Sequence, residues 1–389
     1  MPHRIVVVER GRDDELWLAR KLYVSVRMKS AETPVRALSA PTSSVYNEAG
    51  AFIQRGRWSE RLKSIVEVYR VLNRNRLFRM WEDKAEESRF SYGIERPLRS
   101  VDVNRAIILG IIEYNTGGRR PGQLETEFLA DLLNNPLFDL VAPPIVPKLP
   151  LKDYIEFLGA FLEVIESARF LPLVVPYIPN YATRDVVKLF DYHAGEDRLA
   201  REFICVEFNG GNPISQYSRV SLVIRKALAL ERELGTPVVL HALNLKYGKA
   251  TRASSVVPAK DLLIFAMGFD SFGWSHKRIP IQAGVGRYEL AGKLLNRSDY
   301  GYYSLDIAKE HIEELPGRYR FTLEDVFRNR ELVRLYNAER QALEAEAIKT
   351  KVSEGELGDY LASKQRVLEA RLLDKVRKLQ GAVRQVELA

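Results

Sequence analysis

The chain has 389 residues, of which 46% are hydrophobic and 28% are charged, so it is long enough to bury a large core. No run of eighteen or more apolar residues occurs, which excludes a membrane-spanning helix. The apolar run at residues 5–8 is too short for a signal peptide, and we expect a cytoplasmic protein with no membrane partner. The single cysteine, Cys205, excludes an internal disulfide and a zinc site built from several cysteines.

The formal net charge is +8, from 59 basic and 51 acidic residues. Such a surplus favours a polyanionic partner, of which nucleic acid is the commonest, although many soluble proteins are equally basic. One basic cluster has aromatic residues among it: Arg70, Arg74, Arg76 and Arg79, with Tyr69, Phe78 and Trp81. Basic and aromatic side chains together suit a phosphate backbone with unstacked bases, and a solvated helix face is the alternative.

Regular elements are hard to assign in the first hundred residues. We predict a strand at 22–26, a loop at 31–44 and a helix at 59–79. After residue 101, continuous apolar runs typical of strands covered on both faces alternate with segments of helical periodicity. The predicted strands lie at 106–112, 138–146, 171–177, 203–208, 237–240 and from 268, and the predicted helices at 125–133, 152–169, 185–190, 218–234 and 258–267.

Strands that alternate with helices at this spacing indicate βαβ units and a parallel sheet. The length favours an α/β fold of the (β/α)8 TIM-barrel type over an open sheet. We therefore predict a barrel with an irregular N-terminal region over residues 1–330. Residues 331–389 are almost wholly helical in pattern, with a break at Ser353-Glu354-Gly355, and form the predicted C-terminal helical extension.

In such a barrel the working residues lie at the carboxyl ends of the strands. The predicted ends carry Asn115, Asp139, Tyr177, Glu207, Asn209, His241, Asn244 and Asp270. Each residue also has a structural explanation: Asn115 begins a turn sequence, Gly210-Gly211 permits a tight turn, His241 suits a buried hydrogen bond, and Asp270 suits a cap. Because all of them fall at strand ends of one barrel, we predict a site there.

Several short motifs resemble the tRNA-guanine transglycosylases, in the same order as in that family. Residues 268–272 (Gly-Phe-Asp-Ser-Phe), preceded by Asp261-Leu262-Leu263, are similar to its "D-L-L … G-x-D-x-F-D" stretch. Asn209-Gly210-Gly211 resembles its Gly-Gly base-binding loop, and Asn115-Thr116-Gly117-Gly118 its Asp-Ser-Gly-Gly turn. Residues 332–337, with Ile348 and Gly355 to Tyr360, resemble its closing helices, so the likeness covers about 106–360.

The resemblance implies exchange of a guanine in tRNA or DNA for a 7-deazaguanine base, through a covalent aspartyl intermediate and without a cofactor. It implies catalytic roles for Asp270 and Asn115. Implied substrate-binding residues are Asp139, Tyr177, Asn209, Gly210, Gly211 and His241. A flipped-out nucleotide needs basic surface beside its pocket, which the following residues could supply: Lys246, Lys249, Arg252, Lys277 and Arg278.

The chain departs from the family at three points. The nucleophilic aspartate of "G-x-D-x-F-D" falls on Gly273, the aspartate of Asp-Ser-Gly-Gly falls on Asn115, and the zinc cysteines are absent. Asp270 is then the carboxylate left in the motif to act as nucleophile. One alternative is a non-catalytic nucleic-acid-binding protein of the same fold, within a homo- or hetero-oligomer. Another is a hydrolase with a divalent metal on Glu207, His241 and Asp270.

Overall fold

A computed structural model describes residues 5–41, 47–52, 64–248, 255–276, 292–312 and 322–387. Its main sheet has the strand order β8-β7-β6-β5-β4-β13-β11-β10-β9, and every neighbouring pair is parallel. The two ends of this order, β8 (Leu173–Val174) and β9 (Tyr177–Ile178), are separated only by Val175 and Pro176. Residues 173–178 therefore act as one interrupted strand that pairs with β7 and β10 and closes the barrel, which confirms the predicted fold class.

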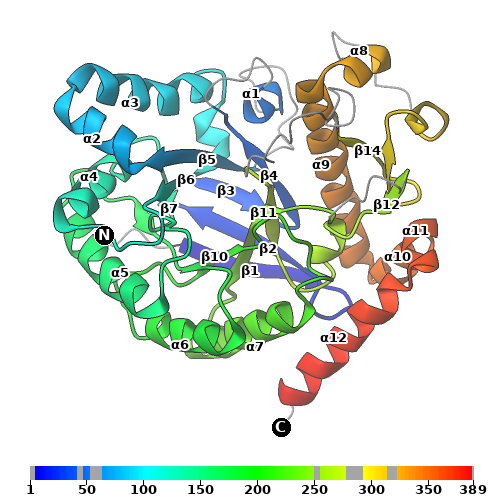
Figure 1. Cartoon of the computed structure of the whole chain (residues 1–389). Helices are drawn as coiled ribbons and strands as arrows, with labels where there is room; N and C mark the ends of the chain where they lie inside the picture. The colour runs from blue at the N-terminus through cyan, green and yellow to red at the C-terminus, as the bar shows by residue number, and fades with distance from the viewer. Residues whose placement is uncertain are drawn as a thin grey trace.

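Helices surround the barrel strands on the outside (Figure 1). The other barrel strands are β4 (Val35–Ser39), β5 (Ser64–Asn73), β6 (Ala106–Asn115), β7 (Leu140–Val141), β10 (Phe203–Glu207), β11 (Val239–Leu245) and β13 (Ser271–Trp274). The helices between them are α1 (Glu48–Phe52), α2 (Arg74–Glu82), α3 (Lys84–Leu98), α4 (Gln123–Leu133), α5 (Leu151–Glu166), α6 (Thr183–Ala194) and α7 (Tyr217–Leu234).

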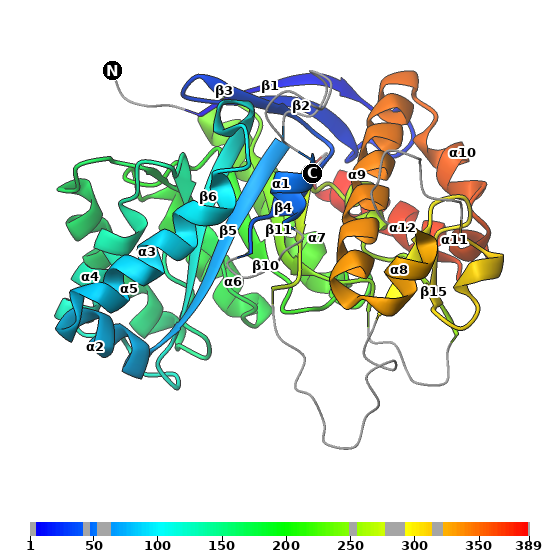
Figure 2. The same cartoon turned by 90° about the horizontal axis from the view of Figure 1, so that it is seen from above.

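The N-terminal region is more regular than the sequence indicated. Strands β1 (Ile5–Arg12), β2 (Arg20–Val26) and β3 (Lys29–Glu32) form an antiparallel sheet across the end of the barrel at which the strands begin (Figure 2). The predicted loop at 31–44 was wrong, because it contains β4. The predicted helix at 59–79 was also wrong in its described part, because residues 64–73 form β5 and only α2 is helical.

Segments before and after β13 form a second layer beside the barrel. A small antiparallel sheet contains β12 (Val256–Pro258), β14 (Lys293–Asn296) and β15 (Gly301–Ser304), and a single 3-10 turn at Leu262–Ile264 replaces the helix predicted over 258–267. Residues 322–387 then form helices α8 (Leu323–Arg328), α9 (Arg330–Glu354), α10 (Leu357–Ala362), α11 (Gln365–Glu369) and α12 (Leu372–Glu387). Helix α9 packs against β4, and α12 packs against α7, as Figure 1 shows. The C-terminal helical extension is thus confirmed.

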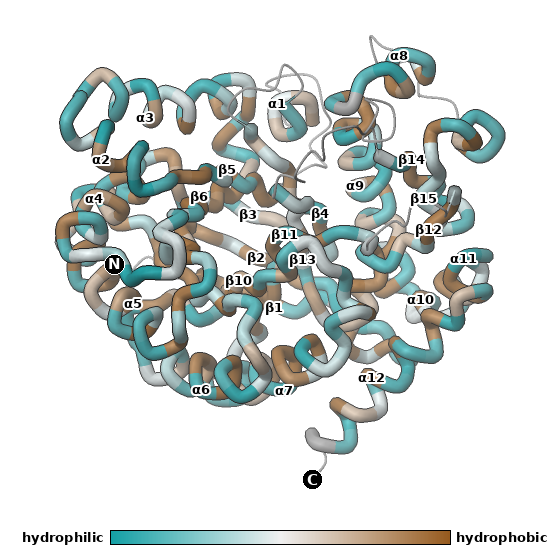
Figure 3. Tube along the Cα trace, in the orientation of Figure 1, coloured by the Kyte–Doolittle hydropathy of each residue, from teal (hydrophilic) through white to brown (hydrophobic). Residues whose placement is uncertain are grey.

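The barrel strands carry the hydrophobic stretches of the chain, whereas the outer helices alternate apolar and polar residues (Figure 3). Ile107, Ile108 and Leu109 of β6 are all fully buried, as expected for a strand between the barrel interior and the helices. The helices bury one stripe each: in α5 this stripe includes Phe157, Phe161 and Ile165. One large core therefore holds the strand ends in fixed positions.

Asp261 is a fully buried carboxylate between the barrel, the small sheet and α9. Its Oδ2 accepts hydrogen bonds from the Tyr302 hydroxyl at 2.7 Å and from Nε2 of Gln341 at 3.0 Å. Burial raises the pKa of Asp261 to about 6 from its usual 3.8, and these hydrogen bonds only partly offset that rise. The folded protein therefore keeps a proton on Asp261 at pH values where the unfolded chain has lost it.

Asp261→Asn is expected to change the pH dependence of stability. Between about pH 4 and about pH 6 the unfolded chain releases the Asp261 proton more readily than the folded protein does. The free energy of unfolding therefore falls as the pH rises through this range. At pH 7 the variant should be more stable than the wild type by up to about 3 kcal/mol, and near pH 4 the two should be almost equal. Urea unfolding at both pH values measures this, with the exposed Asp359→Asn as control. A difference that does not vary with pH would contradict the assignment.

Candidate functional site

Polar side chains gather inside the barrel towards the carboxyl ends of its strands. In a strand, alternate residues point to the same side, and inward residues of β5, β6, β10 and β11 supply most of this group. Its members are Glu67, Tyr69, Glu113, Glu207, His241, Asn244 and His276. Asn244 lies where the pairing of β11 with β13 shifts register, and His276 follows β13. Hydrogen bonds, and the stacking of Tyr69 on His276, connect the members into one network, which we call the mouth cluster.

Glu67 is the centre of the mouth cluster. It is 0% exposed, and its Oε1 lies 2.8 Å from Nε2 of His241 while its Oε2 lies 2.6 Å from Nε2 of His276. Burial opposes ionisation of this carboxyl, but the two imidazoles outweigh it and lower the pKa of Glu67 to about 2. Nδ1 of His241 lies 2.8 Å from the Ser271 hydroxyl oxygen, which orients that ring. Glu67 is therefore an oriented carboxylate anion at neutral pH.

Gly273 is the residue whose missing side chain makes room for Glu67. A Cβ built on Gly273 would coincide with the carboxylate of Glu67, so no other residue fits there while Glu67 keeps this position. Position 273 is where the resemblance expected the nucleophilic aspartate of the transglycosylases. The structure thus places a carboxylate where that side chain would be, but supplies it from β5 on the other side of β4.

Tyr69 and His276 cover Glu67 on the side of the barrel mouth. Their rings are stacked, with centroids 4.5 Å apart and planes 6° from parallel. The Tyr69 hydroxyl donates a hydrogen bond to Glu113. Burial, and then the charges of Glu207 and Glu113, raise the pKa of Tyr69 well above its usual value, so this phenol keeps its proton. The side chain of His276 is 10% exposed, so it is the more accessible partner of Glu67.

Glu207 is the second buried carboxylate of the mouth cluster. Its Oε2 accepts a hydrogen bond from Nδ2 of Asn244 at 2.9 Å, and its Oε1 accepts the backbone N–H of Asn209 at 2.7 Å. The Tyr177 hydroxyl lies 3.4 Å from Oε2. Oδ1 of Asn244 accepts the backbone N–H of His276 at 2.9 Å, which joins this half of the cluster to the Glu67 half. Side-chain contacts therefore link the carboxyl ends of β9, β10, β11 and β13.

Two of the predicted site residues lie at the wrong end of the barrel. Asp270 immediately precedes β13, where its carboxylate pairs with Arg20 of β2 at 3.0 Å and accepts the backbone N–H of Leu240 at 2.8 Å. Asp139 precedes β7 and pairs with Lys29 of β3 at 2.6 Å. The sequence indicated both strands, but it did not show that these two aspartates lie before the strands rather than after them. Both anchor the N-terminal sheet, and neither reaches the mouth cluster.

The other predicted residues lie at the carboxyl ends as expected, or inside the barrel. Tyr177 and His241 belong to the network around Glu207 and Glu67. Asn115 ends β6 and is exposed, with Oδ1 accepting the backbone N–H of Gly117 at 3.2 Å, which is an ordinary turn bond.

The Gly-Gly loop follows β10, as predicted. Asn209 is exposed at its start. Gly210 has φ 75°, and a Cβ on Gly211 would clash with the Gln216 amide, so the local turn explains both glycines. Lys246 follows β11, whereas Lys249, Arg252, Lys277 and Arg278 lie outside the described residues.

The central carboxylate, Glu67, was not among the site residues predicted from the sequence. Glu67 and Tyr69 alternate with apolar residues in the run Ser64-Ile65-Val66-Glu67-Val68-Tyr69, which is the period of a strand with one polar side. That signal was available, but the arginines that follow favoured a helix. Glu113 and His276 carry no local pattern, because only the closure of the barrel brings them to Glu67.

A metal site is not supported by the described residues. No group of three or more His, Cys, Asp or Glu side chains in those ranges is arranged to hold a metal ion. The set proposed for a metal hydrolase is not brought together either, because Asp270 is bound to Arg20 and to the Leu240 amide below the other two.

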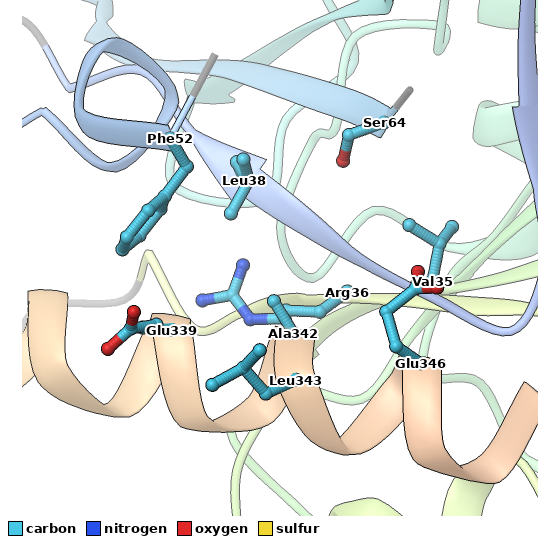
Figure 4. A pocket seen from close by; sticks show the side chains of 9 residues that line it. All are labelled: Val35, Arg36, Leu38, Phe52, Ser64, Glu339, Ala342, Leu343 and Glu346. Carbon is cyan, nitrogen blue, oxygen red and sulfur yellow. The ribbon is translucent and has the colours of Figure 1, made fainter. Parts of the chain in front are cut away.

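A separate hollow lies outside the barrel between β4 and α9 (Figure 4). It has a volume of about 40 Å³, and its walls include Val35, Leu38, Phe52 and Leu343. The guanidinium of Arg36 borders it and is held by Gln341 at 2.9 Å. A few water molecules fit this space and a nucleobase does not, so it is no substitute for the barrel mouth.

No model of a known protein family matches the chain, and no curated protein is similar to it. Within the described ranges, none of the helices has the length and apolarity needed to cross a membrane.

Proposed function

We propose that this protein exchanges a purine base in tRNA or DNA and that Glu67 is its nucleophile. The observation that carries the proposal is the position of the Glu67 carboxylate over Gly273. In the resembling transglycosylases a carboxylate at this position attacks the sugar, and here an oriented, ionised carboxylate occupies the same space from another strand. Asp270 is not proposed for this role, because its carboxylate is bound to Arg20 at the opposite end of β13.

The exchange takes two displacements at one carbon. A Glu67 oxygen forms a bond to C1′ of the nucleotide while the glycosidic C–N bond breaks, and the purine leaves with the bonding electron pair and takes up a proton. A nitrogen of the incoming base then bonds to C1′, the Glu67–C1′ bond breaks, and that base loses a proton. The carboxylate is regenerated, so the reaction needs no oxidant, reductant or cofactor.

The residues around Glu67 have different roles in this scheme. His241, held by Ser271, is a positioning residue that fixes the orientation of the carboxylate. His276 occupies Oε2 and covers Glu67, so the proposal requires this ring to give way when a sugar enters. The carboxylates of Glu113 and Glu207 face the same mouth and suit the N–H groups on the edge of a guanine-like base.

The exchange itself is the experiment that tests this function. Purified protein is incubated with labelled guanine, or a labelled 7-deazaguanine base, and with tRNA or duplex DNA. The proposal predicts incorporation of label into one of these nucleic acids without added metal. Failure to incorporate either base into either acceptor would contradict it.

A second candidate is a non-catalytic nucleic-acid-binding protein of the same fold. The complete burial of Glu67 and the occupation of both its oxygens by imidazoles favour this alternative, because the carboxylate then serves as a structural anion. It predicts salt-sensitive nucleic-acid binding with no base exchange in the same assay.

A further inference from the structure

An arginine and two aromatic rings form a ladder on α2, beside the barrel mouth. Arg74, the first residue of α2, lies over the Phe78 ring with its guanidinium carbon 5.3 Å from the centroid. Phe78 in turn stacks on Trp81, with centroids 6.1 Å apart and planes 7° from parallel. Trp81 is 40% exposed, so part of its ring is open to solvent. Figure 2 shows α2 at the carboxyl end of β5, on the opposite side from the N-terminal sheet.

Two further cations adjoin this ladder. Asn73 at the end of β5 pairs with Asn115 at the end of β6, so α2 and the loop after β6 leave the barrel side by side. Arg119 lies in that loop and is exposed. Lys148 is also exposed, and a Cβ on Gly118 would lie 3.6 Å from its Cβ, so it adjoins the same loop.

Arg74 and Arg119 both lie near the hydroxyl group of Tyr114. Burial and the hydrogen bond from its hydroxyl to Glu125 raise the pKa of Tyr114, and the charges of Arg74 and Arg119 oppose this rise. Arg74 also pairs with Glu125 at 3.0 Å, while its side chain remains 42% exposed. Both guanidiniums therefore lie within electrostatic reach of one buried hydroxyl group.

We propose that this surface binds an unpaired strand of nucleic acid at the barrel mouth. We call it the α2 rim, and it comprises Arg74, Phe78, Trp81, Arg119 and Lys148. The three cations take successive phosphates, and the exposed face of Trp81 takes an unstacked base. The inference rests on the proposed function for its class of partner, but it concerns a surface separate from the mouth cluster.

The charge distribution explains why the backbone would stay on the rim. The interior of the mouth carries the carboxylates of Glu67, Glu113 and Glu207, which repel phosphates but accept hydrogen bonds from a base. The rim carries cations and a flat apolar ring. A nucleotide can therefore enter base first while its flanking phosphates remain outside.

Of the four arginines in the sequence cluster, Arg70 and Arg76 make structural contacts, Arg79 is exposed on α2, and Arg74 belongs to the ladder. Arg70 is buried and donates to the backbone carbonyls of Ala40 and Gly93, so it is structural. Arg76 lies over the Phe90 ring, 5.3 Å from its centroid, where it packs α2 against α3. Arg74 is the arginine of that cluster that both faces the mouth loops and continues into the stacked rings.

Fluorescence anisotropy with a labelled single-stranded oligonucleotide tests the α2 rim in the full chain. Trp81→Ala should weaken binding about tenfold, because one base loses its stacking partner. Arg119→Ala with Lys148→Ala should lower the slope of log affinity against log salt by about 1.4, since two phosphate contacts are lost. The matched control is Arg89→Ala, whose side chain is 70% exposed on α3, away from the rim.

The outcomes separate this inference from the proposed function. Rim variants that bind like the wild type, or a rim that binds an acidic peptide as tightly as the oligonucleotide, would overturn the inference even if base exchange occurs. Rim variants that bind weakly, in a protein that shows no exchange, would support the rim and contradict the proposed function alone. A circular-dichroism melt of each variant checks that it is folded.

Discussion

Replacing Glu67 by glutamine is expected to reduce base exchange by about a thousandfold or more. Glutamine has the size of glutamate but no charge, so it can fill the space over Gly273 and cannot form a stable bond to C1′. Nucleic-acid binding should persist, because the α2 rim is on other elements. Exchange rates with labelled guanine at saturating nucleic acid measure the loss, and the exposed Glu163→Gln on α5 is the control for an ordinary loss of one charge.

A double variant sharpens this prediction. Glu67→Ala removes the carboxylate and clears the space that it occupies above Gly273. Adding Gly273→Asp then returns a carboxylate to the same place from β13. We expect Glu67→Ala to be inactive and the double variant to regain measurable exchange. Full exchange activity in a folded Glu67→Gln variant would show that another group is the nucleophile.

Replacing Asp270 by alanine is expected to destabilise the protein by about 3–5 kcal/mol. The change leaves the buried Arg20 guanidinium with Glu231 as its remaining anionic partner, and removal of one member of a buried ion pair is costly for this reason. It also removes the acceptor for the Leu240 amide. Urea unfolding measures the free-energy change.

The same variant separates the two assignments of the nucleophile. If Asp270 is structural, the folded fraction of Asp270→Ala at low temperature should exchange bases at the wild-type rate. Arg20→Met combined with Asp270→Leu and Glu231→Gln should recover part of the lost stability, since the guanidinium and both of its carboxylate partners are then removed together. Loss of exchange in a fully folded Asp270→Ala protein would contradict the placement of the nucleophile at Glu67.

The barrel could be predicted from the sequence because its second half is locally consistent. Long apolar runs end in Asn-Gly-Gly or Pro-rich turns, and amphipathic helices of ordinary length separate them. In the first hundred residues the apolar pattern and the turn residues do not indicate the same boundaries between elements. Strand β5 is followed at once by α2, without a turn residue such as glycine or proline, so one arginine-rich segment concealed a strand and a helix.

The candidate site could be predicted only in part, for a geometric reason. Periodicity shows that a residue is near a strand. Whether that residue precedes or follows the strand in the chain decides which end of the barrel it reaches. Asn209 follows β10 and His241 lies within β11, so both are near the barrel mouth as predicted. Asp139 and Asp270 precede theirs and were placed at the wrong end. Glu67 reaches Gly273 across β4, a contact that no spacing in the sequence encodes.

The most direct measurement is the mass of the peptide that becomes covalently attached to nucleic acid. The protein is mixed with tRNA or duplex DNA without an incoming base, denatured, and digested with protease and nuclease. We predict a single sugar-phosphate adduct on the peptide that contains Glu67, and none in the Glu67→Gln variant. An adduct on a different carboxylate, such as Asp270, would contradict the assignment.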